Sequence, residues 1–115
     1  MTYIPPLVPR VTVVSAWYNR TEDLELSVCS VLEQEGVDFD FVIIDDSSTD
    51  ETSARLLAIS HPRLRLLRNA RNIGFTASIR RAVEEARGEY VALHDAGDLS
   101  LPGRAVGCVG GFSRR

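Results

Sequence analysis

The chain alternates between short apolar runs and stretches in which apolar positions recur every three or four residues. The runs, many of them β-branched, predict strands, and the recurring positions predict amphipathic helices. In chain order we expect strands over 11–14, 39–44, 64–67 and 90–93, and helices over about 22–35, 50–61 and 76–87. Thr21 or Asn19 is the expected cap of the first helix. The run from Phe39 to Ile44 is typical of a strand buried on both faces of a parallel sheet.

Strands and helices therefore alternate along the chain, with short connections. Because strand–helix–strand crossovers are right-handed, this order predicts a Rossmann-like three-layer α/β/α fold with a mainly parallel sheet. We expect the spatial strand order 3-2-1-4, in which the second and fourth strands flank the first. Residues 10–104 would form one domain, with an extended proline-containing lead-in over 1–9 and an atypical glycine-rich tail over 105–115.

Acidic residues cluster where two of the predicted strands end. Asp45 and Asp46 follow the second strand, and Asp95 and Asp98 follow the fourth. Ligands of open α/β sheets bind at the carboxyl ends of the strands, and adjacent buried carboxylates are costly unless their charge is compensated. Together the clusters predict one site for a sugar nucleotide and a cation. The alternative is that one Asp caps a helix and the others are solvated.

The overall composition narrows the partners that we expect. The formal net charge is −3, so no global positive field favours nucleic acid. No apolar run approaches the roughly 18 residues of a membrane-spanning helix, and the amino terminus lacks the pattern of a signal peptide. Cys29 and Cys108 have neither metal-ligand nor disulfide-framework spacing. These features predict a cytoplasmic protein.

Six short motifs occur along the chain in a fixed order. They are Ala16–Arg20, Ser30–Gln34, Ile43–Asp50, Asn72–Gly74, Ala86–Tyr90 and Asp95–Arg104. Each is weak by itself, but their order and spacing together resemble family 2 glycosyltransferases, whose nucleotide-binding half has the GT-A fold. The resemblance runs from about Val11 to Arg104 and therefore covers most of the chain.

The resemblance implies binding of a uridine or thymidine diphosphate sugar and transfer of the sugar to a saccharide or lipid-linked acceptor. By position in the motifs, Asp46 hydrogen-bonds uracil, Tyr18 packs on the base, and Ala16 belongs to the same substrate-binding turn. Asp95 faces the ribose or a divalent cation, Mn²⁺ or Mg²⁺, for which Asp95 and Asp98 are the expected ligands. Such an acceptor also predicts a peripheral location at the inner membrane face.

Two departures from the family pattern bear on activity. Gly97 stands where the family usually has a second acid, so either Asp98 substitutes through a small backbone change or the metal is held weakly or not at all. Family members also continue well beyond the last motif, and that half carries the acceptor site and the catalytic base. We therefore expect a truncation or a shifted reading frame. The alternative function is a non-catalytic nucleotide-binding domain or partner subunit, which could form homo-oligomers through an uncovered face.

Several of these residues also have simpler interpretations. Tyr18 and its neighbour Trp17 could be core aromatics, and Asp45 could orient its turn through backbone hydrogen bonds. Asp50 is typical of the first turn of a helix, where acids are favoured. His94 has no partner at metal-ligand spacing, which favours a satisfied histidine near a strand end.

A cluster of arginines follows the second helix. Arg63, Arg65, Arg68 and Arg71 could mark a phosphate or membrane-surface patch, although their alternation along a short strand favours a solvated edge. A third function, a flavodoxin-like signalling domain with an acidic phospho-acceptor pocket, is disfavoured because the chain has no lysine.

Overall fold

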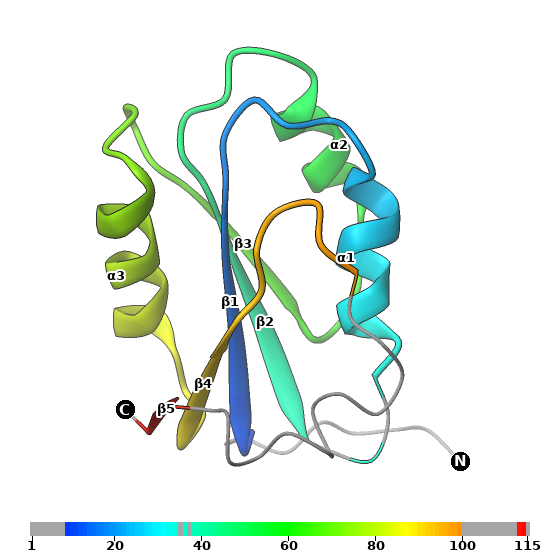
Figure 1. The fold of residues 1–115 in the computed structure, drawn as a ribbon, viewed down its shortest axis with the longest axis vertical. Helices are drawn as coiled ribbons and strands as arrows, with labels where there is room; N and C mark the ends of the chain where they lie inside the picture. Colours follow the sequence, from blue (N-terminus) through cyan, green and yellow to red (C-terminus); the bar gives the residue numbers. More distant parts are fainter. Residues whose placement is uncertain (1–8, 35, 37, 100–112, 115) are drawn as a thin grey trace.

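The computed structural model describes residues 9–34, 36, 38–99 and 113–114, and these residues follow the expected alternation of strands and helices (Figure 1). In chain order the elements are β1 (Val11–Trp17), α1 (Leu24–Leu32), β2 (Phe39–Asp45), α2 (Thr52–Ala58), β3 (Leu64–Arg68), α3 (Phe75–Glu85), β4 (Tyr90–Leu93) and β5 (Ser113–Arg114). Residues 1–8 of the predicted lead-in, and residues 100–112 and 115 of the last motif and the tail, lie outside the described residues. Within the described part, no helix is long and apolar enough to cross a membrane.

The sheet has the strand order β3-β2-β1-β4-β5, which confirms the expected order of the first four strands. These four strands are parallel, with Trp17 of β1 opposite Asp45 of β2 and Val14 opposite Leu93 of β4. The two-residue β5 pairs antiparallel with β4 and was not predicted. Because β2 and β4 both neighbour β1, the segments that follow these two strands lie on either side of the end of β1.

Helices cover both faces of the sheet and give the three expected layers. Figure 1 shows α1 and α2 on one side of the sheet and α3 on the other. Successive strand residues point to opposite faces of the sheet and so divide the core into two clusters. Val13 and Phe41 pack with α1 and α2 on one face, whereas Val14 and Val42 pack with Ala82 of α3 on the other. Each such side chain contributes roughly 1.5–3 kcal/mol when it is fully buried.

The first helix differs from the prediction at both ends. Asp23, with φ +55°, precedes α1 as its cap residue, and neither Thr21 nor Asn19 occupies that position. The Asn19 side chain instead bonds Thr49 in the loop after β2, with 3.0 Å from Asn19 Nδ2 to Thr49 Oγ1. The helix ends at Leu32, before the expected 35.

Gly88 lies unusually close to the backbone of β1. A Cβ at this position would lie 2.6 Å from Thr12 N and 2.7 Å from the Val11 carbonyl carbon, closer than real contacts allow. The Gly88 amide also donates to Thr12 Oγ1 at 2.8 Å. Glycine is therefore required here by the close approach of two backbones, and α3 itself ends earlier, at Glu85.

Candidate functional site at the carboxyl ends of the strands

The carboxyl ends of β1 and β2 bring the first two predicted site segments together. The Asp46 amide donates to the Trp17 carbonyl at 2.8 Å, so the hydrogen-bonded ladder between β1 and β2 continues one residue beyond β2. Asn19 then connects the two loops, because its amide donates to Ser48 Oγ at 3.0 Å and its Oδ1 accepts from the Thr49 amide at 2.7 Å. The turn after β1 is thereby fixed beside the turn after β2.

A pocket of about 320 Å³ opens between these turns and the start of α3. It is lined by Ala16, Trp17, Tyr18, Asp46, Asn72, Gly74 and Phe75. Its volume is at the lower end of the range of small-molecule sites, which is about 300–1,000 Å³. Three of the predicted substrate-binding residues, Ala16, Tyr18 and Asp46, therefore share one cavity.

The two adjacent aromatic residues at the end of β1, Trp17 and Tyr18, have different roles. Trp17 is 1% exposed and belongs to the core, as one of the simpler interpretations predicted. Tyr18 is 48% exposed and lines the pocket, as does Phe75, which begins α3 and is 55% exposed. Two half-exposed rings at the same cavity offer flat apolar surfaces of the kind on which a nucleobase stacks. Phe75 was not predicted as a site residue from the sequence.

Asp46 holds the loop between β3 and α3. Its Oδ1 accepts from Asn69 Nδ2 at 2.9 Å and from the Ile73 amide at 2.8 Å, while Oδ2 accepts from the Gly74 amide at 2.9 Å. Burial of the carboxyl, which is 3% exposed, tends to raise its pKa. The bonds from Ile73, Asn69 and Gly74 outweigh burial and leave the pKa of Asp46 below its ordinary value. Asp46 is therefore a buried carboxylate that shapes the pocket wall.

Asn69 supports this arrangement and was not identified from the sequence. It is 4% exposed, and its Nδ2 also donates to Ser78 Oγ of α3 at 3.0 Å. Its Oδ1 accepts from Arg81 Nη1 at 2.7 Å. The available signal was its place at the start of the asparagine-rich loop that ends in the Asn72–Gly74 motif.

Two neighbouring acids have the structural roles that the simpler interpretations gave them. Asp45 is 1% exposed, accepts from the Ser48 amide at 3.1 Å and from the Ser53 hydroxyl, and so orients the turn after β2. Asp50 accepts from the Thr52 amide at 2.9 Å at the start of α2. Neither carboxylate lines the pocket.

Asp95 and Asp98 lie in the turn after β4 and are not among the residues that line the pocket. Both are exposed, and the Asp98 amide donates to the Asp95 carbonyl at 3.0 Å. Gly97 lies between them in the chain with φ +88°, and the guanidinium of Arg20 lies against it. This turn flanks β1 on the side opposite the loop after β2. The strand order reverses between β1 and β4, and such a switch point is where open α/β sheets bind ligands.

The acids of this turn suit a divalent cation only in part. Among the described residues, no group of three or more His, Cys, Asp and Glu side chains is placed to hold a metal ion. Two exposed carboxylates fit the ligand chemistry of Mg²⁺ or Mn²⁺, since such cations use one or two carboxylates together with substrate phosphates and waters. Asp95 and Asp98 thus have the ligand chemistry for part of such a cation's coordination shell.

His94, directly before this turn, is a structural residue. It is 2% exposed, its Nε2 lies 2.9 Å from Ser27 Oγ of α1, and its ring meets Phe41 edge-on with 6.0 Å between the centroids. The interpretation of His94 as a satisfied histidine is confirmed. Through this contact α1 helps to position the start of the Asp95–Asp98 turn.

Comparison with known proteins identifies relatives of the chain. The sequence model of glycosyl transferase family 2 matches residues 12–112. Succinoglycan biosynthesis protein ExoO of Rhizobium meliloti is 39% identical over 97 residues, covering 84% of this chain and 28% of that protein. The UDP-Glc:alpha-D-GlcNAc-diphosphoundecaprenol beta-1,3-glucosyltransferase WfgD of Escherichia coli is 29% identical over 89 residues, covering 77% and 35%. The chain spans about a third of the length of these curated relatives.

Solved structures show the same fold. The mannosyltransferase PcManGT from Pyrobaculum calidifontis, in complex with GDP-Man and Mn²⁺, superposes with a TM-score of 0.74 at 30% identity, over 89% of this chain and 31% of that chain. Residues 1–349 of S. aureus TarS superpose with a TM-score of 0.75 at 22% identity, over 89% and 31%, which supports the fold alone. Since the family match spans most of its length, the chain belongs to glycosyl transferase family 2.

Proposed function

We propose that this domain binds a nucleoside-diphosphate sugar, with the base in the pocket at the carboxyl ends of β1 and β2. The observation that carries the proposal is the convergence of Ala16, Tyr18 and Asp46 on one cavity of about 320 Å³. In the whole protein the sugar is transferred to a saccharide or a lipid-linked acceptor. The family membership favours this transferase function over the phospho-acceptor and non-catalytic alternatives.

The pocket suits a base with a ring N–H donor. Tyr18 and Phe75 supply the stacking surfaces. The Oδ2 atom of Asp46 accepts from the Gly74 amide at 2.9 Å, and a carboxylate oxygen has two lone pairs, so we propose that Oδ2 also accepts from a donor such as the uracil N–H. We therefore propose a uridine or thymidine diphosphate donor. The relative WfgD, a glucosyltransferase that uses UDP-Glc, supports this choice, and the GDP-Man complex of PcManGT is the competing precedent.

The diphosphate is proposed to lie toward the turn after β4, at the other side of β1. A divalent cation, Mn²⁺ or Mg²⁺, held there by Asp95 and Asp98 would neutralise charge on the diphosphate leaving group. The Mn²⁺ in the PcManGT complex supports this part of the proposal. A cytoplasmic location at the inner membrane face and self-association stay predictions.

Calorimetry with a panel of nucleoside diphosphates tests the proposal directly. UDP and dTDP should bind more tightly than GDP, CDP or ADP, and Mn²⁺ should increase the affinity for UDP. By thermodynamic linkage, UDP should then increase the affinity for Mn²⁺ by the same factor. Binding of GDP in preference to UDP would replace the proposed donor, and the absence of binding to every member of the panel would refute the function.

A further inference from the structure

The arginine cluster that follows α2 divides between the two ends of the sheet. Arg68, at the end of β3, donates to the Ser48 carbonyl at 3.3 Å and so belongs to the carboxyl end. Arg63 and Arg65 lie at the start of β3, at the amino end, far from the candidate site. The prediction of one solvated edge is therefore wrong for Arg65, which is half-buried within a hydrogen-bonded network.

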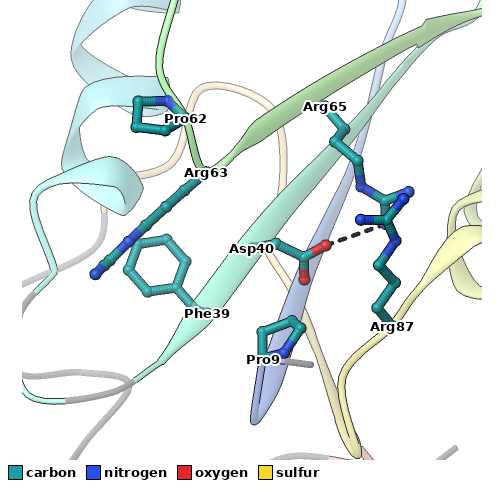
Figure 2. Close-up of a pocket in the computed structure, with 7 residues that line it drawn as sticks. All are labelled: Pro9, Phe39, Asp40, Pro62, Arg63, Arg65 and Arg87. Carbon is teal, nitrogen blue, oxygen red and sulfur yellow. Dashed lines mark hydrogen bonds and ion pairs between the residues drawn. The ribbon is translucent and has the colours of Figure 1, made fainter. Parts of the chain in front are cut away.

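A second pocket of about 110 Å³ opens at this amino end (Figure 2). Three arginines, Arg63, Arg65 and Arg87, line it together with Phe39, two prolines and the single carboxylate of Asp40. Figure 2 shows the Arg63 guanidinium beyond the Phe39 ring, away from Arg65 and Arg87, so the latter two supply the positive charge nearest Asp40. The pocket is therefore positively charged although the chain carries a net charge of −3. A local excess of guanidinium groups of this kind attracts anions.

Asp40 of β2 and the carboxyl end of α3 hold Arg65 in place, and Thr12 of β1 holds Asp40. Asp40 Oδ2 accepts from Arg65 Nη2 at 3.0 Å, and Asp40 Oδ1 accepts from Thr12 Oγ1 at 2.6 Å. The same Arg65 nitrogen donates to the Glu85 carbonyl at the end of α3, at 2.6 Å. Arg65 Nε is buried and has no hydrogen-bond partner among the described residues. The network thus fixes a guanidinium group that retains an unused donor.

The other two arginines are placed by different contacts. Arg63 stacks on Phe39, with 4.6 Å from its Cζ to the ring centroid, which fixes the plane of the guanidinium (Figure 2). The backbone amide of Arg87 donates to Thr12 Oγ1 at 3.2 Å, and its side chain is exposed. Within the described part of the chain, no ion pair involves Arg87. Thr12 therefore connects the Arg87 loop to the carboxylate that orients Arg65.

The size and charge of the pocket select the ligand. A single water needs roughly 10–15 Å³ of cavity volume, and sites for drug-sized ligands begin at about 300 Å³. A pocket of about 110 Å³ admits a small polyatomic group and excludes a nucleotide. A planar guanidinium group can donate two parallel hydrogen bonds to two oxygens of one phosphate. A phosphate monoester carries about −1.5 to −2 charges at neutral pH, which suits the guanidinium groups of Arg65 and Arg87 beside the one carboxylate of Asp40.

We propose that this pocket binds a single phosphate group through the guanidinium groups of Arg65 and Arg87, at a site separate from the nucleotide pocket. The phosphate is either free in solution or the headgroup of a lipid, and both sources present the same dianionic group. The proposal does not depend on which nucleotide, if any, binds at the carboxyl end of the sheet.

Calorimetry with inorganic phosphate at constant ionic strength tests the proposal on the whole 115-residue chain. Saturable binding should occur, and the NMR signal of the Arg65 Nε–H group should shift during the titration. Arg87→Gln should weaken binding by about tenfold or more, because it removes a charge-assisted bond. Arg80→Gln is the matched control, since Arg80 is exposed on α3 and does not line the pocket. Equal losses in both variants, or no saturable binding, would overturn the proposal.

Two further arms locate the phosphate and its source. UDP should leave phosphate binding unchanged, and displacement of phosphate by UDP would overturn the separate site. Sedimentation with phosphatidylcholine vesicles, with and without phosphatidic acid, distinguishes the sources. Retention on phosphatidic acid vesicles that is lost in Arg87→Gln and kept in Arg80→Gln assigns a lipid phosphate. Binding of free phosphate without vesicle retention assigns a soluble phosphate.

Discussion

The guanidinium group of Arg20 lies in the space that a side chain at position 97 would occupy. Arg20 follows β1, and Gly97 belongs to the turn after β4, so their contact joins the two loops on either side of the switch point. The contact places a positive charge beside the turn that carries Asp95 and Asp98. An acidic side chain could not simply be added at position 97, because the backbone there has the left-handed conformation that favours glycine and Arg20 fills the space beside it.

Gly97→Asp should lower the free energy of unfolding by about 1–2 kcal/mol, because an L residue is strained at φ +88°. Gly97→Ala should cost a similar amount, since the strain arises in the backbone and the Arg20 side chain can move aside. Urea unfolding of both variants measures the effect. Wild-type stability in either variant would contradict the left-handed conformation of this turn.

The same pair of variants tests the cation site. If the new carboxylate in Gly97→Asp joins Asp95 and Asp98, Mn²⁺ should increase the affinity for UDP more in this variant than in Gly97→Ala. Calorimetry with and without Mn²⁺ gives the ratio for each protein. An unaltered UDP affinity on addition of Mn²⁺ in the wild type and in both variants would eliminate the cation at this turn.

Asp46→Asn should destabilise the fold by about 1–3 kcal/mol at pH 7, because an amide group would face the donors of Ile73 and Gly74. The pKa of Asp46 is lower in the folded than in the unfolded chain. Its stabilising effect is therefore complete above the unfolded value, near pH 4, and is lost as the pH falls through the folded value.

Urea unfolding of wild type and Asp46→Asn at pH 7 and near pH 3 measures this dependence. The difference between the two proteins should shrink at the lower pH. Asp50→Asn is the comparison: the pKa of Asp50 is also lowered, chiefly by its hydrogen bond with Thr52, but Asp50 is exposed, so its difference from wild type should be smaller at pH 7 and change less with pH. A difference between wild type and Asp46→Asn that is constant with pH would show that Asp46 does not titrate in this range.

Tyr18→Ala should weaken UDP binding by about 1–3 kcal/mol, the usual contribution of an aromatic ring that stacks on a base. Tyr18→Phe should retain most of the affinity, because it keeps the ring. Neither change should alter stability much, since Tyr18 is 48% exposed. Calorimetry with UDP separates the two variants, and equal affinities in Tyr18→Ala and Tyr18→Phe would argue against stacking.

Gly88→Ala should lower the free energy of unfolding by about 1–3 kcal/mol, as expected when a methyl group is forced into a close-packed contact. The added Cβ would meet Thr12 and Val11 at under 3 Å. The loop that carries Arg87 should move away from β1, so phosphate binding should weaken in the same variant. Denaturation and phosphate calorimetry together test both effects, and wild-type behaviour in both would contradict the close approach.

The sheet could be predicted from the sequence because its strands are marked by local patterns. The run before Asp45 is apolar on both faces, and Tyr90–Leu93 has the predicted bounds. Helix ends were less predictable, since Asn19 uses its side chain to bond Thr49, 30 residues away. No local pattern contains a contact of that sequence separation.

The candidate site was predictable in its residues and less so in their roles. Of the substrate-binding residues that the motifs named, Ala16, Tyr18 and Asp46 line one cavity and Asp95 does not, and their role in binding stays a prediction. The internal bonds of Asp46 were not foreseen, because its partner Asn69 lies 23 residues away in a separate loop. Phe75 was missed for a related reason, since an aromatic residue at a helix start resembles any other core residue in sequence.

The hydrogen bonds of Asp46 have a consequence for how tightly a ligand binds. Fixing the backbone of one residue costs about 1–2 kcal/mol in conformational entropy. For the segment from Ile73 to Gly74 this ordering occurs when the chain folds, since Asp46 holds both amides without any ligand. A nucleotide therefore meets a wall that is already rigid, and its affinity is not reduced by the entropy of closing a loop. We expect these amides to show the same NMR order parameters with and without UDP.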